Sequence, residues 1–354
     1  MNPANGPKMA NTREPRPPSV PVPTQSDATS GSGRGAQLVA LIGQRALYVG
    51  LAAIFVFFAA KSPTLFLTAG NFRDIALSSS ILLIVAVPQA LLVIMGYVDL
   101  SVGSMIGLSG VTAGLLINHG INPALAILVA LAVGAVGGLL NGLLVSYANL
   151  SPIIVTLGSL QLFRGIAQLL TENPPADFGR GMSLLGRGLL FGLPVPVWIA
   201  LIALGLGFAF LSGTPSGRHT YAIGVNKEAA FLSGIATKRL PLILFAVTGA
   251  AAALGGVLYA ARLDAAPPGT LGVSFELDVL TAVLLGGIAF SGGRGTMAGV
   301  LVGVVFIGLL RNGMLLLNVS FFWQEIATGS ALIIAAALDQ LALRPLRLRK
   351  ITRD

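Results

Sequence analysis

Long apolar stretches follow one another along most of this chain, and short polar segments separate them. A helix needs about 20 mostly apolar residues to cross a bilayer. The pattern therefore predicts ten membrane-spanning helices, at about residues 42–60, 75–95, 100–118, 123–146, 152–170, 196–212, 241–261, 277–292, 296–316 and 324–342. Glycine, serine and acidic residues crowd the ends of the third and eighth stretches. We expect an all-α polytopic membrane protein, in which spans two to five and seven to ten could form inverted repeats.

The composition agrees with a membrane location. Hydrophobic residues make up 55% of the 354 residues and charged residues only 10%, which lies outside the range of soluble globular domains. The chain has no cysteine, and its only histidines are His119 and His219. Thiolates and imidazoles are therefore almost unavailable as metal ligands. We expect neither a metal nor a cofactor in this chain.

The formal net charge of +9 has two explanations. A basic protein can bind nucleic acid, but Lys and Arg in a membrane protein gather in the cytoplasmic loops. A cytoplasmic N-terminus would place about two thirds of the 22 basic residues on the cytoplasmic side. Trp198 and Trp323 would then both begin spans at the outer face, where aromatic belts form. We expect both termini in the cytoplasm and no nucleic-acid partner.

Three regions follow from this pattern. Residues 1–40 are rich in Pro, Ser and Gly, which predicts a disordered cytoplasmic tail. The first apolar run begins only around Ala46, so no secretory signal peptide is expected. Residues 41–342 form the predicted transmembrane domain, whose longest inner loop covers residues 212–240. Residues 343–354 form a basic cytoplasmic tail.

One carboxylate interrupts the apolar sequence between Ile75 and Ile117, in the stretch Gly96-Tyr-Val-Asp99-Leu-Ser101-Val-Gly103-Ser. An ionised Asp at the centre of a bilayer costs about 2.5–3.5 kcal/mol. The chain must therefore break, bend or face polar space here. Asp99 or Ser101 could simply cap the next helix. Alternatively, Asp99, Ser101 and Gly103 organise the translocation path, and the predicted topology places Asp99 nearer the cytoplasmic end than the midplane.

Two sets of glycines recur at four-residue spacing, which places each set on one helix face. Small residues at this spacing let a neighbouring helix approach closely. We expect both sets to lie at helix contacts; they are Gly134, Gly138 and Gly142 in the fourth span, and Gly295, Gly299 and Gly303 in the ninth.

Motifs for catalysis and for ATP binding are missing from the sequence. It contains no HExxH, GxSxG or GxxxxGK[ST] motif. Glu276 and Asp278 form the closest acidic pair, and their position predicts a helix N-terminus with its favourable dipole. Four carboxylates fall near the ends of spans, namely Asp99, Asp278, Glu325 and Asp339. This position argues against an ion-coupled carrier with buried carboxylates at the midplane. We expect no enzyme activity, and ATP and Mg²⁺ only on a partner.

The inner loop contains one short predicted helix. Asn226 is suited to its N-cap, Glu228 to its first turn, and Gly234 to a left-handed stop. A helix of two turns is marginal in water, so it must dock on something. Ala229, Ala230, Phe231 and Leu232 offer a small and apolar face for a groove on another protein, although packing on this chain's own bundle is the alternative.

At these residues the chain resembles the permease subunits of bacterial ABC importers for monosaccharides, the ribose, xylose, arabinose and autoinducer-2 group. The matching stretches are Gly96 to Ser104, Gly224 to Ile235, Leu285 to Gly295 and Arg311 to Ile333. The resemblance covers about Ala46 to Leu341, and the long N-terminal tail departs from it. It implies a fold like that of type II ABC importers in the bacterial inner membrane.

The resemblance also implies partners and roles. They are a second permease copy or a paralogue, a cytoplasmic ABC ATPase that binds ATP and Mg²⁺, and a periplasmic sugar-binding protein. The ATPase would be coupled through Gly224, Asn226, Glu228, Ala229, Ala230, Ser233 and Gly234. The expected function is the import of a small sugar, a pentose or a related monosaccharide. The alternatives are a branched-chain amino-acid-type ABC permease, an ion-coupled secondary transporter and a membrane enzyme.

Overall fold

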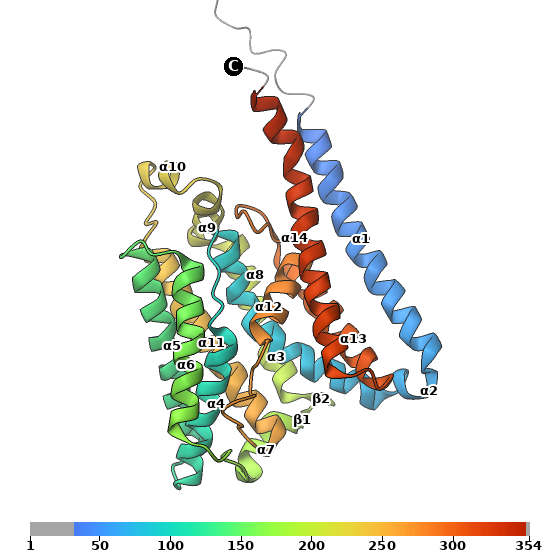
Figure 1. The fold of residues 1–354 in the computed structure, drawn as a ribbon, viewed down its shortest axis with the longest axis vertical. Helices are drawn as coiled ribbons and strands as arrows, with labels where there is room; N and C mark the ends of the chain where they lie inside the picture. The colour runs from blue at the N-terminus through green and yellow to red at the C-terminus, as the bar shows by residue number, and fades with distance from the viewer. Residues whose placement is uncertain (1–31, 352–354) are drawn as a thin grey trace, which may run out of the picture.

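The computed structural model describes residues 32–351, which are mostly helical (Figure 1). The helices are α1 (Ser32–Lys61), α2 (Pro63–Phe66), α3 (Ala69–Ile94), α4 (Val102–Asn118), α5 (Pro123–Ser146), α6 (Pro152–Leu170), α7 (Gly179–Arg187), α8 (Val195–Gly213), α9 (Pro215–Val225), α10 (Lys227–Leu232), α11 (Arg239–Leu263), α12 (Phe275–Leu285), α13 (Met297–Leu316) and α14 (Phe321–Ile351). One short antiparallel hairpin, β1 (Leu189–Leu190) with β2 (Leu193–Pro194), precedes α8.

Six of these helices are long and apolar enough to cross a membrane, namely α3, α5, α6, α8, α11 and α13. Shorter apolar helical stretches cover Leu47–Lys61, Val102–Asn118 and Phe321–Ala337. Every stretch that the hydrophobic pattern marked as a span contains a helix. An all-α polytopic membrane protein is therefore confirmed, whereas the number of ten spans stays a prediction.

The eighth predicted span is shorter than expected. Helix α12 ends at Leu285 and has 11 residues, so it is only about 16 Å long at a rise of 1.5 Å per residue. The glycines that follow turn the chain, since Gly287, Gly292 and Gly293 all have positive φ. The prediction of a helix to residue 292 is wrong because such backbone conformations cannot continue a right-handed helix.

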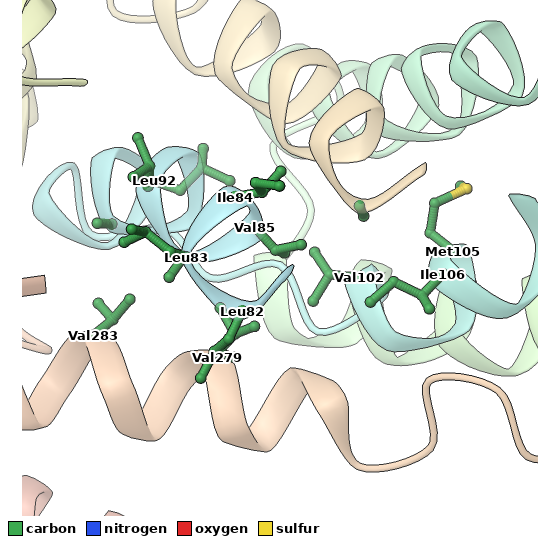
Figure 2. Packing of buried hydrophobic residues seen from close by; sticks show 14 of the residues in the cluster. Leu82, Leu83, Ile84, Val85, Leu92, Val102, Met105, Ile106, Val279 and Val283 are labelled. Atoms are coloured by element: carbon green, nitrogen blue, oxygen red, sulfur yellow. The ribbon is translucent and has the colours of Figure 1, made fainter. Parts of the chain in front are cut away.

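Helix α3 forms the centre of the bundle. From Ile81 to Ile94 its sequence is apolar on every side apart from Gln89, which is typical of a helix buried among other helices, and all residues from Ser79 to Ile94 are buried. Figure 2 shows Leu82 and Val85 of α3 packed among side chains of α4 and α12, including Val102 and Val279. The two helices that flank the polar break and the short α12 therefore share one core.

The glycines of α5 lie where α5 packs against α11. A Cβ at Gly134 would overlap Gly249, and one at Gly138 would overlap the carbonyl oxygen of Phe245. Gly142 lies against Leu242 in the same contact. These backbones can approach so closely only because no side chain separates them.

The glycines around α13 divide differently from the expected trio. Gly299 and Gly303 lie against Gly286 and Ala282 at the end of α12. Gly295 precedes α13 and has a φ of 146°, so it belongs to the loop. The prediction of three glycines on one helix face is wrong for Gly295, because four-residue spacing defines a face only where the backbone is helical.

Helices α1 and α14 pack together at the edge of the bundle. The N-terminal end of α1 and the C-terminal end of α14 both lie at the end of the molecule that carries α10 (Figure 1). Residues 1–31 of the predicted tail lie outside the described residues, and α1 begins at Ser32. Helix α14 continues through the predicted basic tail to Ile351.

Candidate functional site

The polar break lies between α3 and α4 and is buried. After Ile94 the chain turns at Gly96, whose φ of 82° favours glycine, and α4 begins at Val102. Asp99 and Ser101 are both enclosed by protein. Irregular backbone at membrane depth is tolerated where protein surrounds it, and this break meets that condition.

Asp99 orients Ser101. One carboxylate oxygen, Oδ1, accepts hydrogen bonds from the backbone N–H of Ser101 at 2.9 Å and from its hydroxyl at 2.6 Å. Ser101 occupies the N-cap position of α4, but its side chain bonds to no N–H group of the first turn. Capping of α4 by the Ser101 side chain is therefore wrong, because its hydroxyl is turned towards Asp99.

The polar contacts continue into two further helices. Asn141 of α5 donates from Nδ2 to the hydroxyl oxygen of Ser101 at 2.9 Å. Ser159 of α6 donates from its hydroxyl to Oδ1 of Asn141 at 2.5 Å. We call Asp99, Ser101, Asn141 and Ser159 the polar chain; all four side chains are buried. The polar chain connects the break between α3 and α4 to helices α5 and α6 by a continuous series of hydrogen bonds.

The sequence reasoning missed Asn141 and Ser159. The signal was available for Asn141, which is the only strongly polar residue between Ala124 and Val145. A buried amide costs free energy unless it is hydrogen-bonded, so the argument that singled out Asp99 applies to Asn141 as well. Its partners, however, lie 40 and 18 residues away, and local sequence cannot identify them.

The acidic pair at the start of α12 is not a simple cap. Ser274 occupies the N-cap position with a φ of 60° and makes no side-chain cap bond. Asp278 pairs with Arg311 of α13 at 2.6 Å, and Arg311 also pairs with Glu325 of α14 at 3.1 Å. These charges tie three helices together. Glu276 points elsewhere and lies beside Gly103 of α4.

The short helix of the inner loop is confirmed. Helix α10 covers Lys227–Leu232, Asn226 caps it by accepting from the N–H of Ala229 at 3.0 Å, and Glu228 lies in its first turn. Gly234 follows with a φ of 82°. Ser233 occupies the C-cap position, and its hydroxyl donates to the carbonyl oxygen of Ala229.

The expected docking face of α10 is split between two surroundings. Phe231 and Leu232 are 66% and 84% exposed, and Ala229 is also exposed. Ala230 is only 5% exposed and packs against its own chain. Ala230 is therefore wrongly included in a face offered to another protein, because a helix of two turns must bury one side against the bundle to persist.

Helix α9 joins α10 to the core. A Cβ at Gly224 would overlap the carbonyl oxygen of Ile94 at the end of α3. The same carbonyl oxygen accepts from the N–H of Gly293 at 2.7 Å, and the Tyr221 hydroxyl donates to the carbonyl oxygen of Gly295 at 2.8 Å. The loop helices thus contact the end of α3 and the glycine loop after α12.

A pocket of about 500 Å³ lies at the other end of the bundle, where α3 begins and α7 and the β-hairpin lie (Figure 1). Arg73, Arg187 and Arg262 line it together with a single carboxylate, Asp74. Arg262 also donates to the Ser78 hydroxyl at 2.9 Å. The pocket is thus rich in positive charge.

The chain matches the family described as branched-chain amino acid transport system / permease component over residues 71–336. It is 38% identical over 296 residues to the ribose import permease protein RbsC of Bacillus subtilis (strain 168), which covers 83% of this chain and 91% of that protein. It is 35% identical over 293 residues to the D-allose transport system permease protein AlsC of Escherichia coli (strain K12), with 82% and 90% covered. It is 35% identical over 315 residues to the galactose/methyl galactoside import permease protein MglC of the same organism, with 83% and 93% covered. No solved structure matches the chain.

Proposed function

Because this chain belongs to the family of branched-chain amino acid transport system permease components, we propose that it is the membrane permease of an ATP-driven, binding-protein-dependent importer of a monosaccharide. The observation that carries the proposal is the identity of 34–38% to permeases named for ribose, allose and galactose, over more than four fifths of each protein. An amino-acid permease of the same family is the weaker alternative, because these relatives are all named for sugars. The chain has no GxxxxGK[ST] motif, so ATP and Mg²⁺ belong to a separate ATPase subunit.

We propose that α10 receives the motion of that ATPase. Phe231 and Leu232 of α10 are exposed apolar side chains, and Ala229 in the same helix is exposed as well. Asn226, Glu228, Ser233 and Gly234 shape the helix, and Ala230 seats it on the bundle. Gly224 lets α9 touch the end of α3. A displacement of α10 would therefore reach α3 and the neighbouring polar break through packed backbone.

The polar break has an organising role in this proposal. Asp99 and Ser101 hold α4 to α5 and α6 through the polar chain. Gly103 lets α4 approach the start of α12. These contacts would keep α4, α5, α6 and α12 in one moving unit when the ATPase changes state. Direct contact of Asp99 with the sugar is less well supported, because Asp99 is enclosed by protein.

The outer end of the permease suits a periplasmic partner. In the proposed topology both termini and α10 are cytoplasmic, ten spans lie in the bacterial inner membrane, and the arginine pocket faces the periplasm. Three arginines and one aspartate would attract an acidic surface of a sugar-binding protein. A second permease copy or a paralogue would complete the route through the membrane.

Reconstitution of the whole complex tests the function. The chain, its ATPase and its binding protein are placed in proteoliposomes, and uptake is measured for ribose, allose, galactose and leucine. We expect one of the sugars, together with the binding protein, to stimulate both ATP hydrolysis and uptake. Uptake of leucine instead of any sugar would support the amino-acid alternative. Uptake driven by an ion gradient without ATP would refute the ABC assignment.

A further inference from the structure

The chain between α11 and α12 enters the bundle without helical structure. Leu271 lies against Gly107 and Gly110 of α4, and Gly272 lies against Gly103 one turn nearer the start of that helix. Helix α12 begins only at Phe275. Leu271 and Gly272 therefore lie along α4 between Gly110 and its first turn at Gly103. Irregular backbone at this depth is found where protein buries it or where it lines a water-filled space.

Arg164 of α6 holds this segment in place. Its guanidinium donates to the carbonyl oxygen of Leu271 at 2.7 Å and to that of Pro268 at 3.3 Å. A third contact, at 3.5 Å, reaches the carbonyl oxygen of Gly103. Glu276, at the start of α12, lies beside the same Gly103. One arginine thus joins the start of α4 to the irregular segment, close to the start of α12.

The position of Arg164 along α6 gives the depth of this cluster. Helix α6 runs from Pro152 to Leu170 and is a candidate membrane span. At 1.5 Å per residue, Arg164 lies about 18 Å from its first residue and about 9 Å from its last. Arg164 and Glu276 therefore lie well inside the hydrocarbon region, which is about 30 Å thick.

At this depth, charged and apolar side chains lie next to one another and are partly exposed. Arg164 and Glu276 are only partly buried, and Val273 and Leu277 beside Glu276 are 49% and 39% exposed. A charged side chain at the bilayer centre is costly, and such side chains face a bundle interior or water. This face of the chain is therefore unsuited to lipid.

We propose that Arg164, Val273, Glu276 and Leu277 line the water-filled route of the sugar, where this chain faces a second copy of itself. The proposal rests on the proposed function. A carboxylate accepts hydrogen bonds from sugar hydroxyls, a guanidinium donates to their oxygens, and charge-assisted bonds of this kind are strong. Val273 and Leu277 match the C–H faces of a sugar ring. Two copies would place this set on both sides of one route.

Cysteine accessibility tests the proposal, because the natural chain contains no cysteine. Val273→Cys and Leu277→Cys are prepared singly in the full complex. Leu206→Cys is the matched control, since Leu206 is 67% exposed in the middle of α8 with no charged side chain in that helix. Labelling of this chain by a charged, membrane-impermeant thiol reagent is followed by mass, and each variant must first retain sugar uptake.

We expect labelling at 273 and 277 to be at least about tenfold faster than at 206, because the reacting thiolate forms in water and not in hydrocarbon. Excess sugar, with its binding protein and ATP, should slow the reaction at 273 and 277 only. Equal rates at all three positions, or no reaction at both 273 and 277, would overturn the inference. In a complex that still takes up sugar, that outcome leaves the proposed function intact. Absence of sugar uptake in the unmodified complex would refute the proposed function itself.

A second measurement addresses Glu276 directly. Glu276→Gln keeps the shape of the side chain and removes its charge. We expect uptake to fall at least about tenfold, in line with the loss of one charge-assisted hydrogen bond, while ATP hydrolysis stimulated by the binding protein persists. A merely structural role would lower both activities together, or neither, and either result would contradict the assignment of Glu276 to the route.

Discussion

Replacing Asn141 by Leu should destabilise the permease by breaking the polar chain in its middle. Asn141 donates to Ser101 and accepts from Ser159, so the substitution leaves two buried hydroxyl groups without that partner. Leu has the same branched shape as Asn and is larger, so the change creates no cavity. Each unsatisfied buried group costs about 1–3 kcal/mol.

The two hydroxyl groups that lose Asn141 as a partner do not lower the free energy of unfolding by the same amount. The Ser101 hydroxyl still donates to Asp99 and loses only its donor. The Ser159 hydroxyl can rotate towards the carbonyl oxygen four residues earlier in α6, as serine does in helices. We therefore expect a total of about 2 kcal/mol, near the lower limit of the sum. For a chain of 354 residues, a loss of that magnitude lowers the Tm by about 3 °C, because the entropy of unfolding is about 2.1 cal/mol/K per residue.

Thermal unfolding of the purified chain in detergent, followed by circular dichroism, measures the shift. The control is a double-mutant cycle with Ser159→Ala, which removes the group that Asn141→Leu leaves unpaired. Ser159→Ala should cost stability in the natural chain and cost almost none in the Asn141→Leu chain. Two results would refute the role of the polar chain in stability: an unchanged Tm in Asn141→Leu, or the same change of Tm from Ser159→Ala in both backgrounds.

Four further predictions follow from other parts of the structure. Asp99→Asn keeps the oxygen that accepts from Ser101 and should alter the Tm little, whereas Asp99→Ala should lose about 1–3 kcal/mol in the same unfolding experiment; equal Tm values for the two variants would contradict this role of Oδ1. Leu232→Asp should abolish ATP hydrolysis stimulated by sugar and binding protein without lowering the Tm. Ala230→Asp should lower the Tm because Ala230 is buried. The reverse pattern would show that Ala230, and not Leu232, contacts the ATPase. Gly138→Val should lower the free energy of unfolding by about 1–3 kcal/mol, because the new side chain overpacks the α5–α11 contact. Gly158→Ala is the control and should leave the free energy of unfolding unchanged, since no atom of the described residues lies within 4 Å of the added Cβ. Reporter fusions to both termini should report the cytoplasm, and a periplasmic signal from either one would overturn the proposed topology.

Local features of this protein follow from residues close together in the chain. The apolar stretches place the helices, because a segment in a bilayer must satisfy its own backbone hydrogen bonds. Helix α10 with its Asn226 cap and the left-handed Gly234 was predictable for the same reason, since a cap acts over three residues. The motifs at Asp99 and around Asn226 also indicated the family that the relatives support.

The short α12 and the loop position of Gly295 were not predictable from hydropathy. Residues 286–292 remain mostly apolar or small, so hydropathy alone extends the helix past Leu285. The tertiary structure instead turns the chain where Gly286 packs against Gly299 at the start of α13. Small residues permit either outcome, and the packing of the neighbouring helix selects one.

The candidate site depended most on tertiary structure. Hydropathy recognises that Asp99 and Asn141 are polar, but it cannot show that Ser101 and Ser159 complete one chain with them. It also cannot separate Ala230, which faces its own bundle, from Leu232, which does not. In a membrane protein both the lipid-facing and the protein-facing sides of a helix are apolar, so the sequence carries little information about direction. Which side faces protein, and which polar groups meet there, is decided only when helices far apart in sequence pack together.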